Sequence, residues 1–152
     1  MARPTELRSL ESHLGYWLRY VSNHVSHAFS PKLAARGVTV AEWVVLRELY
    51  DSESAPSALA DRLGMTRGAI SKLADRLIAK ALIVRRATAG DRRFQSLALT
   101  RQGRAVTPKL AALADENDQE FFAALDRETR ETIAAAMKEI VRRKGLRGAP
   151  VD

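Results

Sequence analysis

The run from Pro56 to Arg104 constrains the fold more than any other part of this 152-residue chain. Pro56 suits the first turn of a helix, because backbone N–H groups there have no partner within the helix and proline lacks this group. Leu59 and Leu63 follow at the four-residue spacing of one helix face. Gly64 can take the left-handed conformation that ends a helix, and the hydroxyl of Thr66 can accept from the free N–H groups that begin the next one. Two helices joined by a tight turn are therefore expected.

The second of these helices has two unlike faces. Its apolar side chains recur at steps of three and four, namely Ile70, Leu73, Ala74, Leu77, Ile78 and Ala81. The opposite face carries Arg67, Gly68, Ser71, Lys72, Asp75 and Arg76. A cationic, hydroxyl-bearing face that is narrow at a glycine fits the major groove of DNA, where Arg and Lys reach guanine edges or phosphates. Taken alone, a charged helix face of this kind is more often simply solvated.

A β-hairpin is expected next. Residues 83–87 and 94–99 have the composition and alternation of strands, and Gly90 lies in the turn between them. A two-stranded hairpin is marginally stable alone, so it must lean on the helices, which places its tip beside their cationic face. At this tip Arg92 and Arg93 could reach a minor groove or phosphates, and Asp91 could brace a guanidinium.

The order helix, turn, helix, hairpin predicts a winged helix-turn-helix that contacts double-stranded DNA. The fold class expected for the chain is mainly α with a small β-hairpin wing. The residues expected to contact DNA are Thr66, Arg67, Gly68, Ser71, Lys72, Arg76, Asp91, Arg92 and Arg93.

The distribution of charge supports this interpretation. Residues 55–104 hold 11 Lys and Arg against 3 Asp and Glu, a net +8, whereas the rest of the chain holds 14 against 15, a net −1. The whole excess lies in the winged segment, as expected of a surface that binds DNA. An anionic membrane could attract the same patch, but the segment has no long amphipathic helix that combines a basic face with a bulky apolar face.

Several other classes of function find no support in the sequence. The chain has no cysteine, which excludes disulfides, thiolate metal sites and a cysteine redox switch. We expect no enzyme, because no nucleophile beside a base, phosphate loop or carboxylate pair is visible. We also expect no cofactor and no metal, although His13, His24 and His27 could form a site if Glu11 or a partner chain completed it. A cytoplasmic location is expected because no signal peptide or membrane span is apparent.

Helices are expected on both sides of the winged segment. An apolar heptad pattern predicts one over residues 6–29, and a short one follows from Pro31 to Ala35. Thr39 can cap a helix over residues 41–50. After the wing, Thr100 can cap a long helix, and Asp126 can cap a last one that runs over residues 128–144 to Gly145.

The first and last helices carry apolar stripes and could fold back on the winged core in a monomer. As long helices at both ends of the chain, they favour a homodimer instead. We expect residues 1–36 and 105–145 to form dimerisation helices, residues 37–104 the winged domain, and residues 146–152 a frayed tail. The interface residues expected are Leu7, Leu10, Leu14, Val21, Phe121, Ile133, Met137 and Ile140.

The run SALADRLGMTRGAISKLADRLIAKALIVRRATAGDRRFQSLALTRQGR resembles the MarR family of bacterial transcriptional regulators. The likeness includes an Asp-x-Arg signature in the wing, residues 91–93, and a closing Leu-Thr-x-x-Gly turn, residues 99–103. Two residues depart from the family pattern. Ala81 replaces a glycine and would cost up to about 1 kcal/mol in a left-handed backbone. Phe94 replaces a small residue and would alter the placement of the wing and its contacts.

The resemblance implies a homodimer on a pseudo-palindromic operator, with half-sites about 34–36 Å apart. It also implies a repressor that is relieved by a small ligand, often an aromatic acid, bound between the dimer helices and the winged lobe. The candidate ligand contacts are Trp17, His24, Trp43 and Arg86, although both tryptophans could simply be core. The alternative function is a chromosome-coating protein without sequence preference, for which the basic patch would suffice. A ratio of specific to non-specific DNA affinity of ~10³ or more would indicate a regulator instead.

Overall fold

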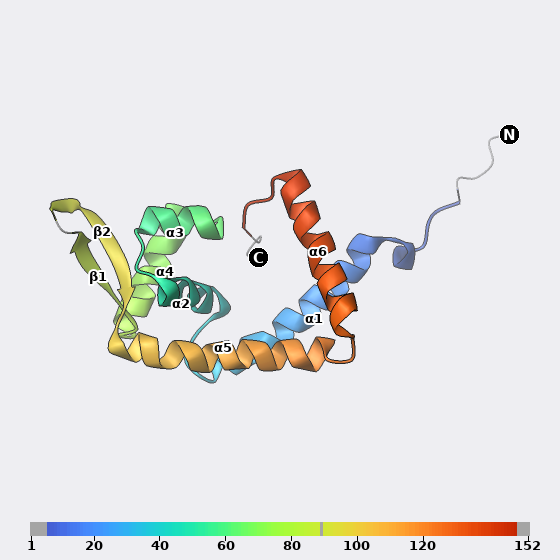
Figure 1. Ribbon diagram of the computed structural model, residues 1–152, viewed down its shortest axis with the longest axis horizontal. Helices are drawn as coiled ribbons and strands as arrows, with labels where there is room; N and C mark the ends of the chain where they lie inside the picture. The colour runs from blue at the N-terminus through green and yellow to red at the C-terminus, as the bar shows by residue number, and fades with distance from the viewer. Residues whose placement is uncertain (1–5, 89, 149–152) are drawn as a thin grey trace.

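The computed structural model describes residues 6–88 and 90–148, apart from the side chains of Thr88 and of residues 91–94. It confirms a mainly α-helical chain with a two-stranded hairpin (Figure 1). In chain order the elements are the 3-10 turn η1 (Leu10–Ser12), α1 (Leu14–Ala34), α2 (Val40–Asp51), α3 (Pro56–Leu63), α4 (Arg67–Ala79), β1 (Ile83–Thr88), β2 (Asp91–Leu99), α5 (Arg101–Phe122) and α6 (Arg127–Lys144).

A winged lobe made of α2, α3, α4 and the hairpin contains most of the buried core. Thr39 begins α2 with a capping box, in which its hydroxyl accepts from the N–H of Glu42 and the Glu42 carboxylate accepts from the N–H of Thr39. Leu33 of α1 and Leu110 of α5 complete the core from outside the lobe. The most deeply buried side chains are Leu33, Val45, Leu46, Leu49, Leu59, Ile70, Leu77, Ile83, Leu97 and Leu110.

The hairpin is longer than its sequence predicts. β1 pairs antiparallel with β2 from Ile83 opposite Leu99 to Thr88 opposite Asp91, with an irregularity after Ala87. Residues 91–93, expected at the tip, therefore belong to β2, which pairs at Asp91 with Thr88 and resumes a regular register at Gln95 opposite Ala87. The connector before α3 also pairs with the hairpin, since Ser54 and Leu97 exchange backbone hydrogen bonds of 3.1 and 2.8 Å.

The base of the wing is held at Ala81 and Leu82. Ala81 has a φ of 58° and is the one residue other than glycine with a positive φ in the described part of the chain. The Thr100 hydroxyl donates to the carbonyl of Ala81 at 2.7 Å, and the Thr100 N–H donates to the carbonyl of Leu82 at 3.0 Å. A side chain at Gly103 would overlap the Leu82 carbonyl, so this glycine lets α5 approach the wing closely.

The prediction for the N-terminal helix was wrong at both ends. α1 begins at Leu14 rather than Glu6, because residue His13 has an extended backbone that separates the helix from η1. It then continues through Pro31 to Ala34, where separate helices were expected. Pro31 removes one helical hydrogen bond and crowds the carbonyl one turn back. Contacts between distant segments offset this cost, because the continued helix buries Leu33 and brings Lys32 within 2.8 Å of Glu120.

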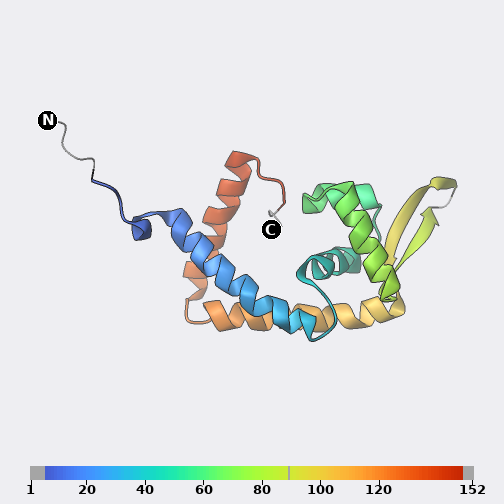
Figure 2. The same ribbon diagram turned by 180° about the vertical axis from the view of Figure 1, so that it is seen from behind.

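α5 connects the winged lobe to a second group of helices formed by α1 and α6 (Figures 1 and 2). Asn117 of α5 is buried and donates to the Val25 carbonyl of α1 at 3.2 Å. Asp126 caps α6 by accepting from the Thr129 N–H at 2.7 Å, and Gly145 ends it with a φ of 59°, as predicted. α6 buries none of its residues. No helix within the described residues is both long and apolar enough to cross a bilayer.

Replacing Ala81 by glycine should raise the free energy of unfolding by up to about 1 kcal/mol, because glycine takes a positive φ without the clash of a Cβ. Chemical denaturation at equilibrium measures the change. Ala112→Gly is the control, since Ala112 is an exposed helical residue of α5 and glycine there should cost about 0.5–1 kcal/mol. A loss of stability for both variants would show that Ala81 is not strained.

Candidate nucleic-acid interface

The local structure around α4 sets the position of its first turn. Gly64 ends α3 in the left-handed conformation, with a φ of 64°, and the Met65 N–H donates to the Ala60 carbonyl at 3.0 Å. The hydroxyl of Thr66 then accepts from the Ala69 N–H at 3.1 Å and caps α4. The two helices of the motif are thus joined as the sequence predicts.

The outer face of α4 is open to solvent. Ile70, Leu73, Ala74 and Leu77 are buried, and every residue proposed from the opposite face is exposed. The exposed set is Thr66, Arg67, Gly68, Ser71, Lys72, Asp75 and Arg76. The predicted division between a core face and a cationic outer face is confirmed.

Gly68 lies in this face, and neither its backbone conformation nor a close contact requires glycine there. A Cβ built there would meet a single neighbour within 4 Å, the hydroxyl oxygen of Thr66 at 4.0 Å, and its φ is not positive. Alanine is also the better helix former. A side chain at this position would thus fit among the described residues, and its absence leaves the backbone of α4 accessible at this point.

A buried carboxylate connects α4 to α2. Glu42 is 0% exposed, and its Oε2 accepts from the Nζ of Lys80 at 2.7 Å. Its Oε1 lies 2.6 Å from Nη2 of Arg76, without the alignment of a hydrogen bond, so this contact is an ion pair. Both cations come from the C-terminal half of α4 and its cap, and they hold this half against the beginning of α2.

Burial and charge act in opposite directions on Glu42. Desolvation raises the pKa of its carboxyl, whereas the hydrogen bond from Lys80, the hydrogen bond from the Thr39 N–H and the charges of Lys80 and Arg76 lower it. The lowering effects win, and the pKa lies below its usual value of 4.5. Glu42 is therefore a carboxylate at neutral pH.

This arrangement changes the role expected of Arg76. The sequence places it among the DNA contacts, but its guanidinium is paired with Glu42 while its side chain remains 52% exposed. Neighbouring Asp75 is also engaged, because its Oδ1 lies 2.7 Å from Nη2 of Arg85 in β1. Arg76 thus fixes α4 against α2, and Asp75 fixes it against the wing. Among the contacts of the described residues, the cations of the outer face that have no acidic partner are Arg67 and Lys72.

The wing presents a second part of the expected interface. The Asp75–Arg85 pair holds β1 beside α4. The backbone of Asp91, Arg92 and Arg93 forms the first part of β2, but the contacts predicted for these side chains lie outside the described residues.

The four residues proposed for a ligand do not share one site within the described contacts. Trp17 and His24 lie on α1, where both rings pack near Tyr20, and the indole N–H of Trp17 donates to the Glu11 carbonyl. Trp43 is partly buried against the core, and Arg86 lies 3.5 Å from the carboxylate of Glu53.

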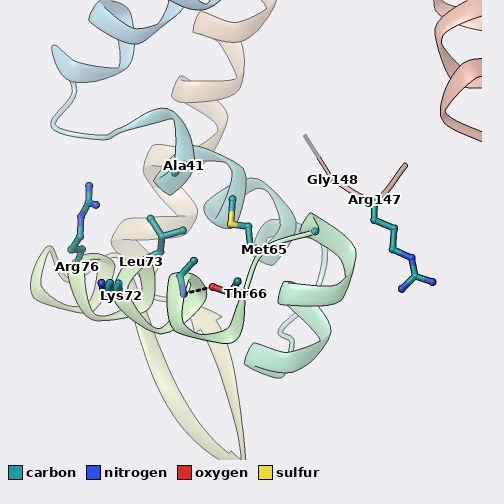
Figure 3. Close-up of a pocket in the computed structure, with 10 residues that line it drawn as sticks. Ala41, Met65, Thr66, Lys72, Leu73, Arg76, Arg147 and Gly148 are labelled. Carbon is teal, nitrogen blue, oxygen red and sulfur yellow. Dashed lines mark hydrogen bonds between the residues drawn. The ribbon is translucent and has the colours of Figure 1, made fainter. Parts of the chain in front are cut away.

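A pocket of about 490 Å³ lies instead beside α4 (Figure 3). Its floor is apolar. The cations Lys72 and Arg76 lie on one side, and a third cation, Arg147, lies with Gly148 on the other side. The apolar part of the lining is Ala41, Met65, Ala69 and Leu73.

The residues predicted to form a dimer are exposed on the outer helices. Leu7 and Leu10 precede α1, Leu14 and Val21 lie on it, and Phe121 lies at the end of α5. Ile133, Met137 and Ile140 lie on α6. Leu14, Val21, Ile133 and Met137 line a single apolar groove of about 650 Å³ between α1 and α6.

Sequence reasoning missed Glu42 and Lys80. The pattern Thr39-x-x-Glu42 is the signature of a capping box, and it could have marked Glu42 as a residue with a structural role. The pairing of Glu42 with α4 has no local signal, because its partners are distant in sequence.

Comparison with known proteins agrees with this geometry. Residues 36–93 match the model of the MarR family. An HTH-type transcriptional repressor of Bacillus subtilis, YetL, is 30% identical over 88 residues, a match that covers 56% of this chain and 53% of the repressor. The chain thus spans about half the length of this curated relative.

Two solved structures share the fold. The Staphylococcus aureus MepR–DNA complex has a TM-score of 0.78 at 24% identity, covering 86% of this chain and 98% of MepR. CouR of Rhodococcus jostii RHA1, solved with bound p-coumaroyl-CoA, has a TM-score of 0.77 at 21% identity and covers 88% and 95% of the two chains. At these identities the likeness establishes the winged architecture and the arrangement of the outer helices.

Changing Glu42 to glutamine should lower the free energy of unfolding at neutral pH by about 1–3 kcal/mol, because Arg76 and Lys80 lose their carboxylate. The pKa of Glu42 is lowered by folding, so its contribution is complete above pH 4.5 and is lost as the pH falls through the folded-state pKa. Denaturation between about pH 7 and pH 3 should show a gap between the two proteins that closes on acidification. A gap of constant size would contradict this assignment.

Proposed function

We propose that this chain, whose residues 36–93 match the model of the MarR family, is a transcriptional regulator of that family and binds double-stranded DNA with α4 and the wing. In this proposal the protein acts by binding DNA and not by catalysis. It would do so in the cytoplasm, where bacterial DNA is located. The observation that carries the proposal is the outer face of α4, where Arg67, Ser71 and Lys72 surround the unobstructed backbone of Gly68.

Each group on this face has a use on DNA. Arg67 can donate two parallel hydrogen bonds to a guanine edge, Lys72 can bind guanine or phosphate, and Ser71 can donate or accept. Gly68 lets the helix backbone approach the groove without a Cβ between them. Arg76 is the exception, because Glu42 already holds its guanidinium, and its contribution to DNA binding is the orientation of α4.

The protein binds its operator as a homodimer in this proposal. Several apolar side chains of α1 and α6 are exposed, among them Leu14 at 69% and Met137 at 45%. A soluble chain rarely leaves such a stripe uncovered. A second copy would cover the groove between α1 and α6, and a two-fold axis would present two copies of α4 to half-sites of a pseudo-palindrome.

Repression relieved by a small anionic or aromatic ligand is the regulatory mode that we propose. The pocket beside α4 supports it, because an apolar floor next to Lys72 and Arg76 suits a molecule with an apolar body and an acidic group. A ligand there would compete with Glu42 for Arg76 and so act on the position of α4.

Selection of bound sequences from random duplex DNA tests the proposed function. A pseudo-palindrome with half-sites about 34–36 Å apart is expected. Arg67→Ala should then relax the preference at one base pair of each half-site and cost about 1–3 kcal/mol in binding free energy.

The control for this variant is Arg47→Ala, which removes the same charge from a site on α2 where Arg47 pairs with Asp51. It should leave the selected sequence unchanged. Equal losses of affinity on all sequences would make Arg67 a phosphate contact, and recovery of no preferred sequence would favour a chromosome-coating protein over a regulator.

Val21→Asp should abolish dimerisation and, with it, high-affinity binding to the selected operator, because it places a charge in the proposed apolar seam of α1. Sedimentation measures the assembly, and a binding titration measures the affinity. Ser26→Asp adds the same charge at an exposed residue of α1 outside the groove and should change neither. A dimeric Val21→Asp variant would place the interface elsewhere.

A further inference from the structure

The chain turns back towards the winged lobe after α6. Gly145 leaves the helix in the left-handed conformation, and the Leu146 N–H donates to the Val141 carbonyl at 3.0 Å. This cap directs the following residues off the helix axis. Figures 1 and 2 show the segment leaving the end of α6 towards α3. The expectation of a frayed tail from residue 146 thus does not describe Arg147 and Gly148.

Gly148 lies directly against the turn that precedes α4. A Cβ at Gly64 would lie 2.5 Å from the Cα of Gly148 and 2.7 Å from the Arg147 carbonyl oxygen, and a Cβ at Gly148 would overlap the carbonyl of Leu63. Both glycines have a φ of 64°. Two backbones can approach this closely only where neither has a side chain, so the contact depends on glycine at both positions.

The contact closes a ring of elements. From α4 the chain passes through the wing and α5 to α6, and the tail then returns from α6 to the turn before α4 (Figures 1 and 3). α5 has 22 residues and thus a length of about 33 Å. α5 is attached to the lobe through Leu110 and to α1 through Asn117. The contact between Gly148 and Gly64 adds a separate attachment between the end of α6 and the turn before α4, and it restricts bending between these two helices.

We infer that Gly148 is a positioning residue, which acts through Gly64 to fix the recognition helix α4 relative to the dimerisation helix α6. In a two-fold dimer this contact restricts the distance and the angle between the two copies of α4. The positioning of α4 relative to α6 follows from the contact between Gly148 and Gly64. Its effect on DNA binding rests on the proposed function.

Distance measurements within one chain test this positioning. The chain has no cysteine, so cysteines introduced at exposed Asp61 of α3 and Lys138 of α6 carry the only two spin labels. Dimers mixed with an excess of unlabelled chain isolate the distance within one protomer. Pulsed electron spin resonance should give one narrow distribution.

Gly148→Ala should broaden this distribution, because its methyl group cannot fit against Leu63 and alanine disfavours a positive φ. Removal of residues 146–152 should broaden it to the same extent. Gly15→Ala is the matched control, since no atom lies within 4 Å of a Cβ at Gly15, and it should leave the distribution narrow. Narrow distributions in both tail variants would overturn the inference.

Operators with altered spacing test the effect on DNA binding. One inserted base pair moves a half-site by about 3.4 Å and turns it by about 34°. The unaltered protein should reject this spacing, and the rejection should weaken by about threefold to tenfold in Gly148→Ala, with folding intact. An unchanged spacing preference beside a broadened distance distribution would show that the tail does not position α4 on DNA. If the unaltered protein bound no DNA specifically, the proposed function would fail, and the distance measurement would still decide the contact.

Discussion

The winged lobe depends on a carboxylate that is buried between two helices. Glu42 is taken from water by the packing of α2 on α4, and its charge is compensated by Arg76, Lys80 and the N–H of Thr39. A buried charge is costly to leave unpaired, so its partners restrict how α4 can slide or rotate against α2. The outer face of α4 takes its direction from this contact. The cations of α4 therefore divide into those that orient the helix and those, Arg67 and Lys72, that are left to face outwards.

Close backbone contacts hold the other ends of the lobe. Gly103 allows α5 to approach Leu82 at the base of the wing, and Gly64 allows Gly148 to approach the turn before α4. Neither contact could form with a side chain in place. α4 is thus held on three sides, by the charge cluster around Glu42, by the wing through Asp75 and Arg85, and by the tail. Such a support suits the proposed DNA-binding surface, which in the proposed homodimer would present a few side chains at a defined distance from a second copy of itself.

Burial divides the chain into two parts. The core lies in the winged lobe and takes Leu33 from the end of α1 and Leu110 from the middle of α5, whereas no residue of α6 is buried. The same apolar residue types thus occur as core in one part and as exposed stripes in the other. This contrast underlies the proposed homodimer, because the stripes of α1 and α6 need a partner surface that a single chain does not supply.

The sequence by itself determined the order of the elements and most of their ends. Caps at Thr39, Thr66, Thr100 and Asp126 and left-handed glycines at Gly64 and Gly145 act within a few residues, so their effects can be predicted from local chemistry. Only the tertiary structure decided that α1 passes through Pro31, that Arg76 turns to Glu42, and that Gly148 meets Gly64. In these three cases the outcome depends on burial and contact between segments far apart in the chain, and neither spacing nor propensity carries that information.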